Sequence, residues 1–439
     1  MSRQATLEAL VRVQENASYS NIVLDHIFSK KNLSAKDKSF ASALFYGVIE
    51  KKLLLDYNIS RLSDIRPDKI SPEVWIILQM GLYQIFFMSS VPDAAAVNES
   101  VNLCKVNHHR SASGYVNGVL RAAAKLDAPM LPNIKKGKNK YYSVKYSTPE
   151  YLIQYWRQCY GDENTMSLLR SLDGRPPLCA RVNTLKTTAD ELKKSFEKSG
   201  VTAEFSDTVE NCLLLSKTDS VEKLRQYQDG LFHIQDTASQ ICCRLLSAKK
   251  GDTVLDVCAA PGGKSFTLAE YMENCGTIIS CDLYDSRLSL IQNGAQRLGI
   301  DMIRTVACNS AEYDDFPLAD RVLCDVPCSG LGIIRRKPEL RYKENIGLDT
   351  LPEIQYAILC NCARFVKSGG LLLYSTCTLN PKENNENVRR FLLEHNDFEE
   401  YEIDTGNIQR CIEERKNELT LFPHKNHTDG FFISVLKRK

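Results

Sequence analysis

The chain has 439 residues, more than one hydrophobic core usually serves, so we expect two or three domains. Hydrophobic residues make up 43% and charged residues 25%, no stretch holds the roughly 18 apolar residues of a membrane span, and the start MSRQATLEAL lacks the apolar core of a secretory signal. The composition thus excludes a membrane partner and predicts a cytoplasmic globular protein. The net charge of +2 hides an asymmetry: residues 1–145 hold 20 Lys and Arg against 12 Asp and Glu (+8), and the remainder holds 36 against 42 (−6).

The first third of the chain is predicted to be helical up to about residue 127. Its apolar residues recur at helical spacing, and polar and proline clusters such as Arg66-Pro67-Asp68 and Ser71-Pro72 mark the helix ends. The recurring positions are Leu7, Leu10 and Val11, and then Trp75, Leu78, Leu82 and Ile85. The excess of positive charge in this part indicates a polyanionic partner such as nucleic acid, although a solvated basic surface has the same composition.

The next segment, LDAPMLPNIKKGKNKYYSVKY, has the composition of an exposed basic linker. Tyrosines alternate with its lysines, so stacking on RNA bases is one interpretation, and a plain solvated linker is the other. The residues concerned are Lys135, Lys136, Lys138, Lys140, Lys145, Tyr141, Tyr142 and Tyr146. We assign residues 1–140 to a helical RNA-binding domain together with this basic linker.

Residues 141–235 are predicted to form a small α+β domain that positions RNA. A helix over Pro149–Tyr160 precedes the strand-like LCARVNTL, the polar helix TADELKKSFEKSG and the short strands VTAEF and NCLLL. From residue 236 to residue 439 apolar strands alternate with helices, which is typical of a doubly wound α/β sheet of the Rossmann-like kind. The predicted strands are Thr253–Val257, Gly276–Cys281, Met302–Ala307, Arg321–Asp325 and Gly370–Ser375.

The first of these strands runs into a glycine-containing turn, TVLDVCAAPGGKSFTLAEYM. Small residues at this place allow a ligand to approach the backbone at a helix N-terminus. The GGKS run resembles the end of a phosphate-binding P-loop, but Cys258 stands where the first glycine of that motif belongs. Asp256 at the strand end would repel a triphosphate and suits the cationic methionine end of S-adenosylmethionine. Asp282, about 20 residues further on, is expected to bind ribose hydroxyls, with a helix N-cap as the alternative.

Two cysteines stand directly after two other strands, Cys328 in LCDVPCSGLG and Cys377 in LLLYSTCTLNP. Carbon 5 of cytosine is a poor nucleophile, and a thiolate that adds to carbon 6 activates it. Such chemistry needs a reactive cysteine beside the cofactor, and Asp325 is placed to contact the nitrogen-3 and amino edge of the ring. These residues leave open which cysteine attacks.

The other cysteines, among 16 in total, read as buried small hydrophobes in a reducing compartment. The chain has no C-x-x-C pair and no Cys/His cluster at zinc-ligand spacing; Cys360 and Cys362 form only a C-x-C. We therefore expect no metal.

The motifs DVCAAPGGK, CDLYDSRL, DVPCSGLG and YSTCTLNPKENNENV resemble those of the RNA cytosine-5 methyltransferases. The helical first domain is similar to the NusB fold. With RVNTLK and FHIQDTAS between them, the whole resembles the bacterial small-subunit (16S) ribosomal RNA methyltransferase B group. The resemblance implies ribosomal RNA as partner and S-adenosylmethionine as cofactor, and we expect a monomer.

This resemblance also implies roles for individual residues. Cys377 is the nucleophile, Cys328 assists product release, and Asp325 positions the base. The implied cofactor contacts are Cys258, Ala259, Ala260, Pro261, Gly262, Gly263, Lys264, Asp282, Asp325 and Asn309, the last where the family often has Asp.

The sequence thus predicts methylation of carbon 5 of a cytosine in 16S ribosomal RNA through a covalent cysteine adduct. Arg335, Arg336 and Lys337 are expected to contact phosphate, with a solvated loop as the alternative. The same chemistry on transfer RNA or another ribosomal site, a catalytically silent RNA-binding assembly protein, and a P-loop ATPase are the competing hypotheses.

Overall fold

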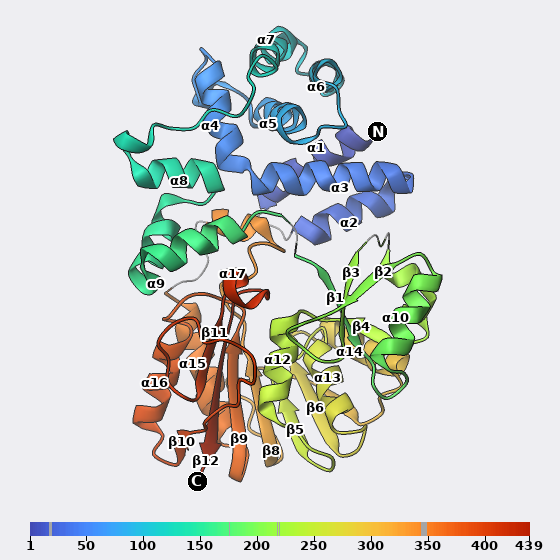
Figure 1. Ribbon diagram of the computed structural model, residues 1–439, viewed down its shortest axis with the longest axis vertical. Coiled ribbons are helices and arrows are strands. Elements are labelled where there is room, and N and C mark those ends of the chain that lie inside the picture. The colour runs from blue at the N-terminus through green and yellow to red at the C-terminus, as the bar shows by residue number, and fades with distance from the viewer. Residues whose placement is uncertain (17–19, 175, 217, 219, 344–348) are drawn as a thin grey trace. The chain divides into compact units, whose positions relative to one another are not determined.

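The computed structural model describes residues 1–16, 20–174, 176–216, 218, 220–343 and 349–439. The chain forms two compact units, shown in Figure 1. One comprises residues 1–174 together with 334–344, and the other comprises residues 175–333 together with 345–439. We call them the helical unit and the sheet unit. In the described ranges, no helix is long and apolar enough to cross a membrane.

The helical unit confirms the predicted all-helical first third. Ser71 accepts a hydrogen bond from the backbone N–H of Val74, and Pro72 occupies the first turn, so α5 begins where the polar cluster predicted it. Apolar faces of the helices pack into one core around Phe45, Ile77 and Leu120, each 0% exposed. The helices are α1 (Ser2–Asn16), α2 (Ser20–Lys30), α3 (Ala35–Glu50), α4 (Lys52–Leu62), α5 (Pro72–Phe87), α6 (Asp93–Val106) and α7 (Ser113–Ala123).

The predicted exposed linker is wrong in its second half. Lys138–Tyr146 form helix α8, which packs against α4 and against the long helix α9 (Glu150–Ser171). Val144 and Tyr146 are buried on the packed side, so the Tyr146 ring is not exposed for stacking on a base. Lysines alternate with the hydrophobic residues here, which concealed the short buried face from a composition-based prediction. The predicted domain boundary between residues 140 and 141 falls inside this helix.

Residues 334–344 belong to the helical unit, although the prediction assigned them to the last domain. They contain a short 3-10 helix, Pro338–Tyr342, that packs against α3. Arg341 is 1% exposed and donates to the backbone oxygens of Tyr146 at 3.1 Å and Ser147 at 3.2 Å. Glu339 accepts hydrogen bonds from the backbone N–H of Ser20 at 3.0 Å and from its Oγ at 2.9 Å. Two buried charged residues thus anchor this segment.

The sheet unit begins with a small antiparallel sheet in the order β2-β3-β1-β4, which confirms the predicted α+β region. Thr188 and Glu191 form a reciprocal capping box at the start of α10 (Ala189–Lys198). Arg181 donates to Glu270 at 2.8 Å, and this buried ion pair ties the small sheet to α13. The strands are β1 (Leu178–Val182), β2 (Thr202–Phe205), β3 (Cys212–Ser216) and β4 (Phe232–Ile234), and a short helix α11 spans Arg225–Gln228.

The large sheet has the order β10-β12-β9-β8-β5-β6-β7, with β11 paired to β12. The run from β9 to β7 is parallel and confirms the predicted Rossmann-like fold. The antiparallel strands β10, β11 and β12 were not predicted. The strands are β5 (Thr253–Asp256), β6 (Thr277–Asp282), β7 (Ile303–Ala307), β8 (Ala319–Asp325), β9 (Val366–Thr376), β10 (Phe398–Glu400), β11 (Glu418–Leu421) and β12 (Phe431–Arg438).

Helices cover both faces of this sheet. One core contains α12, α13 and α14 with Val254 and Leu323 of the strands, and the other contains α15 and α16 with Leu255 and Val322. Neighbouring residues of one strand thus enter opposite cores, as the alternation of side chains along a strand requires. The helices are α12 (Thr237–Leu246), α13 (Gly263–Tyr271), α14 (Asp285–Leu298), α15 (Leu351–Ala363), α16 (Asn385–Glu394) and α17 (Pro423–Asn426).

Candidate active site

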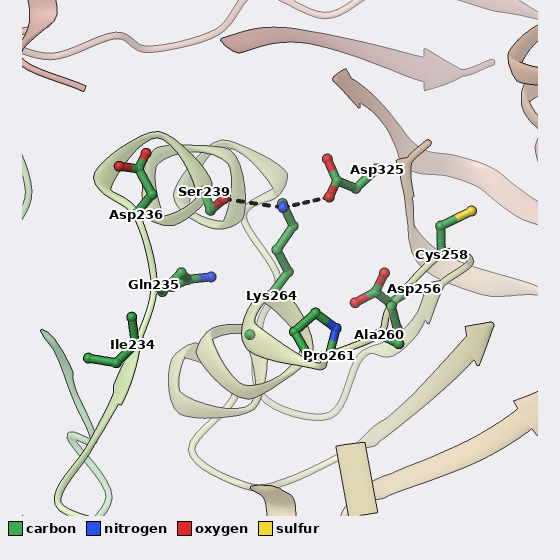
Figure 2. Close-up of a pocket in the computed structure, with 12 residues that line it drawn as sticks. Ile234, Gln235, Asp236, Ser239, Asp256, Cys258, Ala260, Pro261, Lys264 and Asp325 are labelled. Atoms are coloured by element: carbon green, nitrogen blue, oxygen red, sulfur yellow. Dashed lines mark hydrogen bonds and ion pairs between the residues drawn. The ribbon is translucent and has the colours of Figure 1, made fainter. Parts of the chain in front are cut away.

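A cavity of about 230 Å³ lies at the carboxyl ends of β5 and β8 in the sheet unit (Figure 2). Ligands of open α/β sheets bind at this edge. Three segments contribute its lining: the approach to α12, the turn between β5 and α13, and the end of β8. The lining residues are Ile234, Gln235, Asp236, Ser239, Asp256, Cys258, Ala259, Ala260, Pro261, Gly263, Lys264 and Asp325.

The turn between β5 and α13 is closely packed. Gly262 has a φ of +107°, and a Cβ atom there would lie 2.5 Å from the ring of Phe266. Its backbone N–H donates to the Ala259 oxygen at 2.7 Å. Glycine at position 262 thus lets the turn pack against Phe266, and Gly263, the next residue, lines the cavity at the start of α13.

Asp256 presents an unsatisfied acceptor in the cavity wall. The residue is 1% exposed, and its Oδ2 accepts a hydrogen bond from Ser265 Oγ at 2.6 Å. Its Oδ1 is buried and has no hydrogen-bond partner among the described residues. Burial raises the pKa of this carboxyl to about 7, against the opposing effects of Ser265 and Lys264. A buried acceptor of this kind needs a donor, and a ligand with a cationic or amino group would supply it.

Lys264 and Asp325 form an ion pair across the cavity, with 2.6 Å between Nζ and Oδ2 (Figure 2). Lys264 Nζ also donates to Ser239 Oγ at 3.3 Å, and Ser375 Oγ donates to Asp325 Oδ1 at 2.8 Å. Burial lowers the pKa of Lys264, but the charge of Asp325, its hydrogen bond with Lys264 and the nearby Cys242 and Cys243 together outweigh burial, so the pKa is raised overall. The carboxylate of Asp325 is therefore held by one bond on each oxygen. The sequence reasoning treated these two residues separately and missed their pairing.

Asp282 and Asn309 do not line this cavity, although they stand at the ends of the neighbouring strands β6 and β7. Asp282 is 4% exposed and pairs with Arg287, with 3.0 Å between Nη1 and Oδ2. Arg287 also donates to the Ala260 oxygen at 2.7 Å, so it links the Asp282 turn to the cavity wall. The N-cap of α14 is Tyr284, so Asp282 is not the helix cap that was the alternative. Asn309 is exposed.

The sequence reasoning missed Arg287 and the lining residues Ile234, Gln235, Asp236 and Ser239. The latter belong to the segment FHIQDTAS, which the family motifs already marked. Arg287 lies in the first turn of the helix that follows Asp282, and this nearness in sequence could have predicted its contact with Asp282.

The two predicted cysteines meet. The sulfurs of Cys328 and Cys377 are 3.1 Å apart, and both are free, partly exposed thiols. Strands β8 and β9 are parallel neighbours in which Asp325 lies opposite Ser375, so the residues that follow each strand leave the sheet side by side. The pKa of Cys328 is raised well above its usual value, first by its hydrogen bond with Cys377 and then by burial. The pair therefore contains one thiol that keeps its proton.

Close backbone packing fixes the loop that follows Cys328. Gly332 donates its N–H to the Cys377 oxygen at 3.0 Å, and Gly430 donates to the Gly332 oxygen at 2.9 Å. A Cβ atom on Gly332 would lie 2.0 Å from the Gly430 oxygen. Glycine is thus required where the two cysteine loops and the segment before β12 meet.

The site thus combines a pair of thiols at the ends of β8 and β9, an oriented carboxylate, and a cavity with a buried acceptor in its wall, a set suited to nucleophilic catalysis and to binding a cationic ligand. Among the described residues, no cluster of three His, Cys, Asp or Glu side chains has the geometry of a metal site. Arg335, Arg336 and Lys337 are half-buried and directly precede the 3-10 helix Pro338–Tyr342 of the helical unit. Their contact with phosphate stays a prediction.

Comparison with known proteins matches three parts of the chain to family models. The model described as 16S rRNA methyltransferase RsmB/F matches residues 243–437, the NusB family matches residues 1–125, and a ferredoxin-like domain of RsmF/B-like methyltransferases matches residues 148–222. The chain is 36% identical to the probable ribosomal RNA small subunit methyltransferase B of Bacillus subtilis, over 100% of this chain and 98% of the relative. It is 35% identical to the corresponding protein of Synechocystis, over 100% and 99%.

Solved structures agree with this relation. A methyltransferase homolog from Pyrococcus horikoshii, 26% identical, covers 69% of this chain and 99% of its own with a TM-score of 0.61. A further solved structure, also 26% identical, superposes on 100% of this chain and 98% of its own with a TM-score of 0.84.

Proposed function

The chain belongs to the ribosomal RNA small subunit methyltransferase B family, and from this premise we propose that it methylates carbon 5 of a cytosine in 16S ribosomal RNA. It is a methyltransferase by membership of that family. The observation that carries the cytosine-5 proposal is the 3.1 Å between the Cys328 and Cys377 sulfurs. Methylation of an exocyclic nitrogen needs no cysteine, whereas activation of carbon 5 needs a thiolate at carbon 6.

We assign the cavity to S-adenosylmethionine, which supplies a methyl group on a cationic sulfonium when it is bound. The lining fits this ligand, because Asp256 offers a buried acceptor without a partner among the described residues and Gly263 lines the cavity without a side chain. The residues assigned to hold it are those of the 258–264 turn, with Asp282 and Asn309 toward the nucleoside. Asp256 and the Lys264–Asp325 ion pair also make the cavity a poor triphosphate site, which disfavours the P-loop ATPase hypothesis.

In the proposed reaction the Cys377 thiolate adds to carbon 6 of the cytosine. The electron pair of the carbon 5–carbon 6 double bond moves to carbon 5, which accepts the methyl group. Loss of the carbon-5 proton to a base restores the double bond and expels the thiolate. Asp325, oriented by Lys264 and Ser375, is assigned to the nitrogen-3 and amino edge of the ring. Cys328 is assigned to product release.

The assignment of the two thiols is tested with Cys328→Ala and Cys377→Ala. Cys328→Ala should accumulate a protein–RNA adduct that survives denaturation, because the attacking thiol remains and the releasing group is gone. Cys377→Ala should form none. The readout is a denaturing gel with labelled 16S RNA, and Cys275→Ala, at an exposed cysteine, serves as matched control. Adducts with the opposite dependence would overturn the assignment, and adducts with neither variant would contradict cysteine catalysis.

The substrate is tested by mapping 5-methylcytosine in 16S RNA from cells with and without the protein. Loss of one site supports the ribosomal assignment. If every ribosomal site persists, transfer RNA becomes the substrate to examine, and a protein that leaves all RNA unmethylated would fit the silent assembly factor.

We further propose that helix α8 contacts RNA. Lys138, Tyr141, Tyr142 and Lys145 have the spacing i, i+3, i+4, i+7, which places them on one face of the helix. Both lysines are exposed, both tyrosines are partly exposed, and residues 131–147 contain no acidic residue. Basic charge that alternates with aromatic rings suits single-stranded RNA, because the lysines meet phosphates and the rings stack on bases.

A further inference from the structure

The side chain of Glu383, in the turn after β9, is buried at 0% exposure and fully hydrogen-bonded. Its Oε1 accepts from Ser329 Oγ and, at 2.8 Å, from Asn380 Nδ2. Its Oε2 accepts from the Ser329 backbone N–H at 2.9 Å and from Gln355 Nε2 at 2.8 Å. Two donors on each oxygen occupy the acceptor sites of a carboxylate, so this is the geometry of a buried anion.

These bonds connect the loops that carry the two cysteines. Ser329 directly follows Cys328, while Glu383 lies six residues beyond Cys377 in the next turn. The Ser329 and Thr378 hydroxyl oxygens are 2.7 Å apart, and because Ser329 donates to Glu383, Thr378 is the donor of that pair. The residue after each cysteine is thereby tied to the same carboxylate, directly or through one hydroxyl.

A second tie reaches the other side of Cys328. Gln355 of α15 donates to Glu383 and also, at 2.9 Å, to the backbone oxygen of Pro327. The residues that flank Cys328 are therefore both held through Glu383 and its partners. Movement of this carboxylate would shift the Cys328 sulfur relative to Cys377.

We propose that Glu383 is a positioning residue that gives the two thiols their different roles: its anion holds the Cys328 loop so that the Cys328 S–H donates to the Cys377 sulfur, and Cys377 is the thiol that ionises. This inference rests on the proposed function, in which Cys377 attacks the base. It adds a residue outside the two cysteine motifs to the determinants of that choice.

The electrostatics agree with this geometry. The pKa of Cys328 is raised by its hydrogen bond with Cys377, by burial, by the charge of Cys377 and by the charge of Glu383. A nearby anion disfavours the ionisation of a thiol, and a donated hydrogen bond favours the thiolate that accepts it. Both effects keep the proton on Cys328.

The test is Glu383→Gln, which keeps the size of the side chain, removes its charge and turns one acceptor into a donor. We would alkylate the full chain with iodoacetamide, without RNA, between pH 6 and 10 and follow the modification of Cys377 and Cys328 by mass spectrometry. In the wild type Cys377 should react before Cys328. In Glu383→Gln the preference for Cys377 over Cys328 should fall at least tenfold, and the pH at which Cys328 reacts should decrease. A purely structural role would not move this pH profile selectively.

Glu386→Gln, an exposed carboxylate three residues further on, is the matched control and should keep the wild-type preference. Glu383→Asp, which retains the charge, should restore part of it. Wild-type preference in a folded Glu383→Gln protein would overturn the proposal. If that variant does not fold, Ser329→Ala removes one donor and leaves the anion; a smaller change in the same direction supports the proposal, and no change overturns it.

Failure of this inference can be told apart from failure of the proposed function. The alkylation experiment needs neither RNA nor a methyl donor, whereas the adduct experiment with Cys328→Ala needs RNA. If no adduct forms but Glu383→Gln changes the alkylation preference as expected, only the cytosine-5 chemistry is contradicted. If Cys328→Ala forms the adduct but Glu383→Gln keeps the wild-type alkylation preference, only the role of Glu383 is contradicted.

Discussion

At the residue scale, Asp256 at the end of β5 lowers the stability of the fold while it provides an acceptor for a ligand. Asp256 is almost fully buried, and burial raises the pKa of its carboxyl to about 7. The same residue offers the acceptor without a partner that we assign to the cofactor. Placing a carboxylate there lowers the stability of the folded chain, and such a cost is typical of functional sites.

This leads to a prediction for the pH dependence of stability. The folded state binds the Asp256 proton more tightly than the unfolded state. The stabilisation of the folded state by this proton is therefore fully present below about pH 4 and is lost as the pH rises through about 7. Asp256→Asn should remove this dependence. Between pH 4.5 and pH 8 the wild type should lose up to about 3.5 kcal/mol more unfolding free energy than the variant, since about 2.5 units separate pH 4.5 from the folded-state pKa and one pKa unit corresponds to about 1.4 kcal/mol.

Urea unfolding of both proteins at the two pH values measures this difference. Glu270 and Glu414, whose pKa values burial also raises to about 7, are present in both proteins, so their contributions cancel. Curves that shift equally with pH would contradict the prediction.

At the scale of elements, parallel pairing of β8 and β9 explains how two distant cysteines become neighbours. Strand patterns and the turn after each strand predicted that Cys328 and Cys377 share one sheet edge. The order of strands within the sheet, which decides that these two are adjacent, follows from packing of helices on both faces and was not readable from the chain. The same holds for the Lys264–Asp325 and Arg181–Glu270 pairs, which join residues 61 and 89 positions apart.

Helix α8 shows the opposite case, in which local composition misled the prediction. Its lysines and Gly137 resemble a linker, yet Ser143 and Val144 pack and make it a helix. Burial of a few side chains against α4 outweighs the local preference, because tertiary contacts stabilise short helices more than propensity does.

The predicted RNA face of α8 can be tested on the same helix. Lys138→Ala with Lys145→Ala should weaken binding of a 16S RNA fragment. It should also reduce the slope of log affinity against log salt by about 1.4, since each phosphate contact with a single strand contributes about 0.7. Lys140→Ala is the control, because Lys140 lies on the side of α8 that lines a cavity with α4. Binding of the RNA fragment is measured at several salt concentrations. An equal effect of Lys140→Ala would contradict the assignment of RNA binding to this face of α8.

At the scale of the whole molecule, the helical unit is assembled from two stretches of chain. Residues 334–344 supply the buried Arg341 and Glu339, so residues 1–174 alone lack part of their packing. A fragment of residues 1–174 should therefore melt below a fusion in which a flexible linker joins it to residues 334–344. The expected difference is several degrees, since 1 kcal/mol shifts the Tm by about 2–4 °C at this size.

Circular dichroism of the fragment and the fusion measures the difference in Tm, and the fusion carrying Arg341→Ala should lose most of the gain. Equal melting of the fragment and the fusion would show that the segment contributes nothing to the stability of the unit.

The discontinuous helical unit also sets the order of events during synthesis. Residues 1–174 leave the ribosome first, but their last piece follows about 160 residues later. At about 5–20 residues per second, that interval lasts roughly 10–30 s. For this time the nascent chain carries an incomplete helical unit while the first strands of the large sheet are still emerging. Completion of one unit thus depends on translation of most of the other, which links the two in time as well as in sequence.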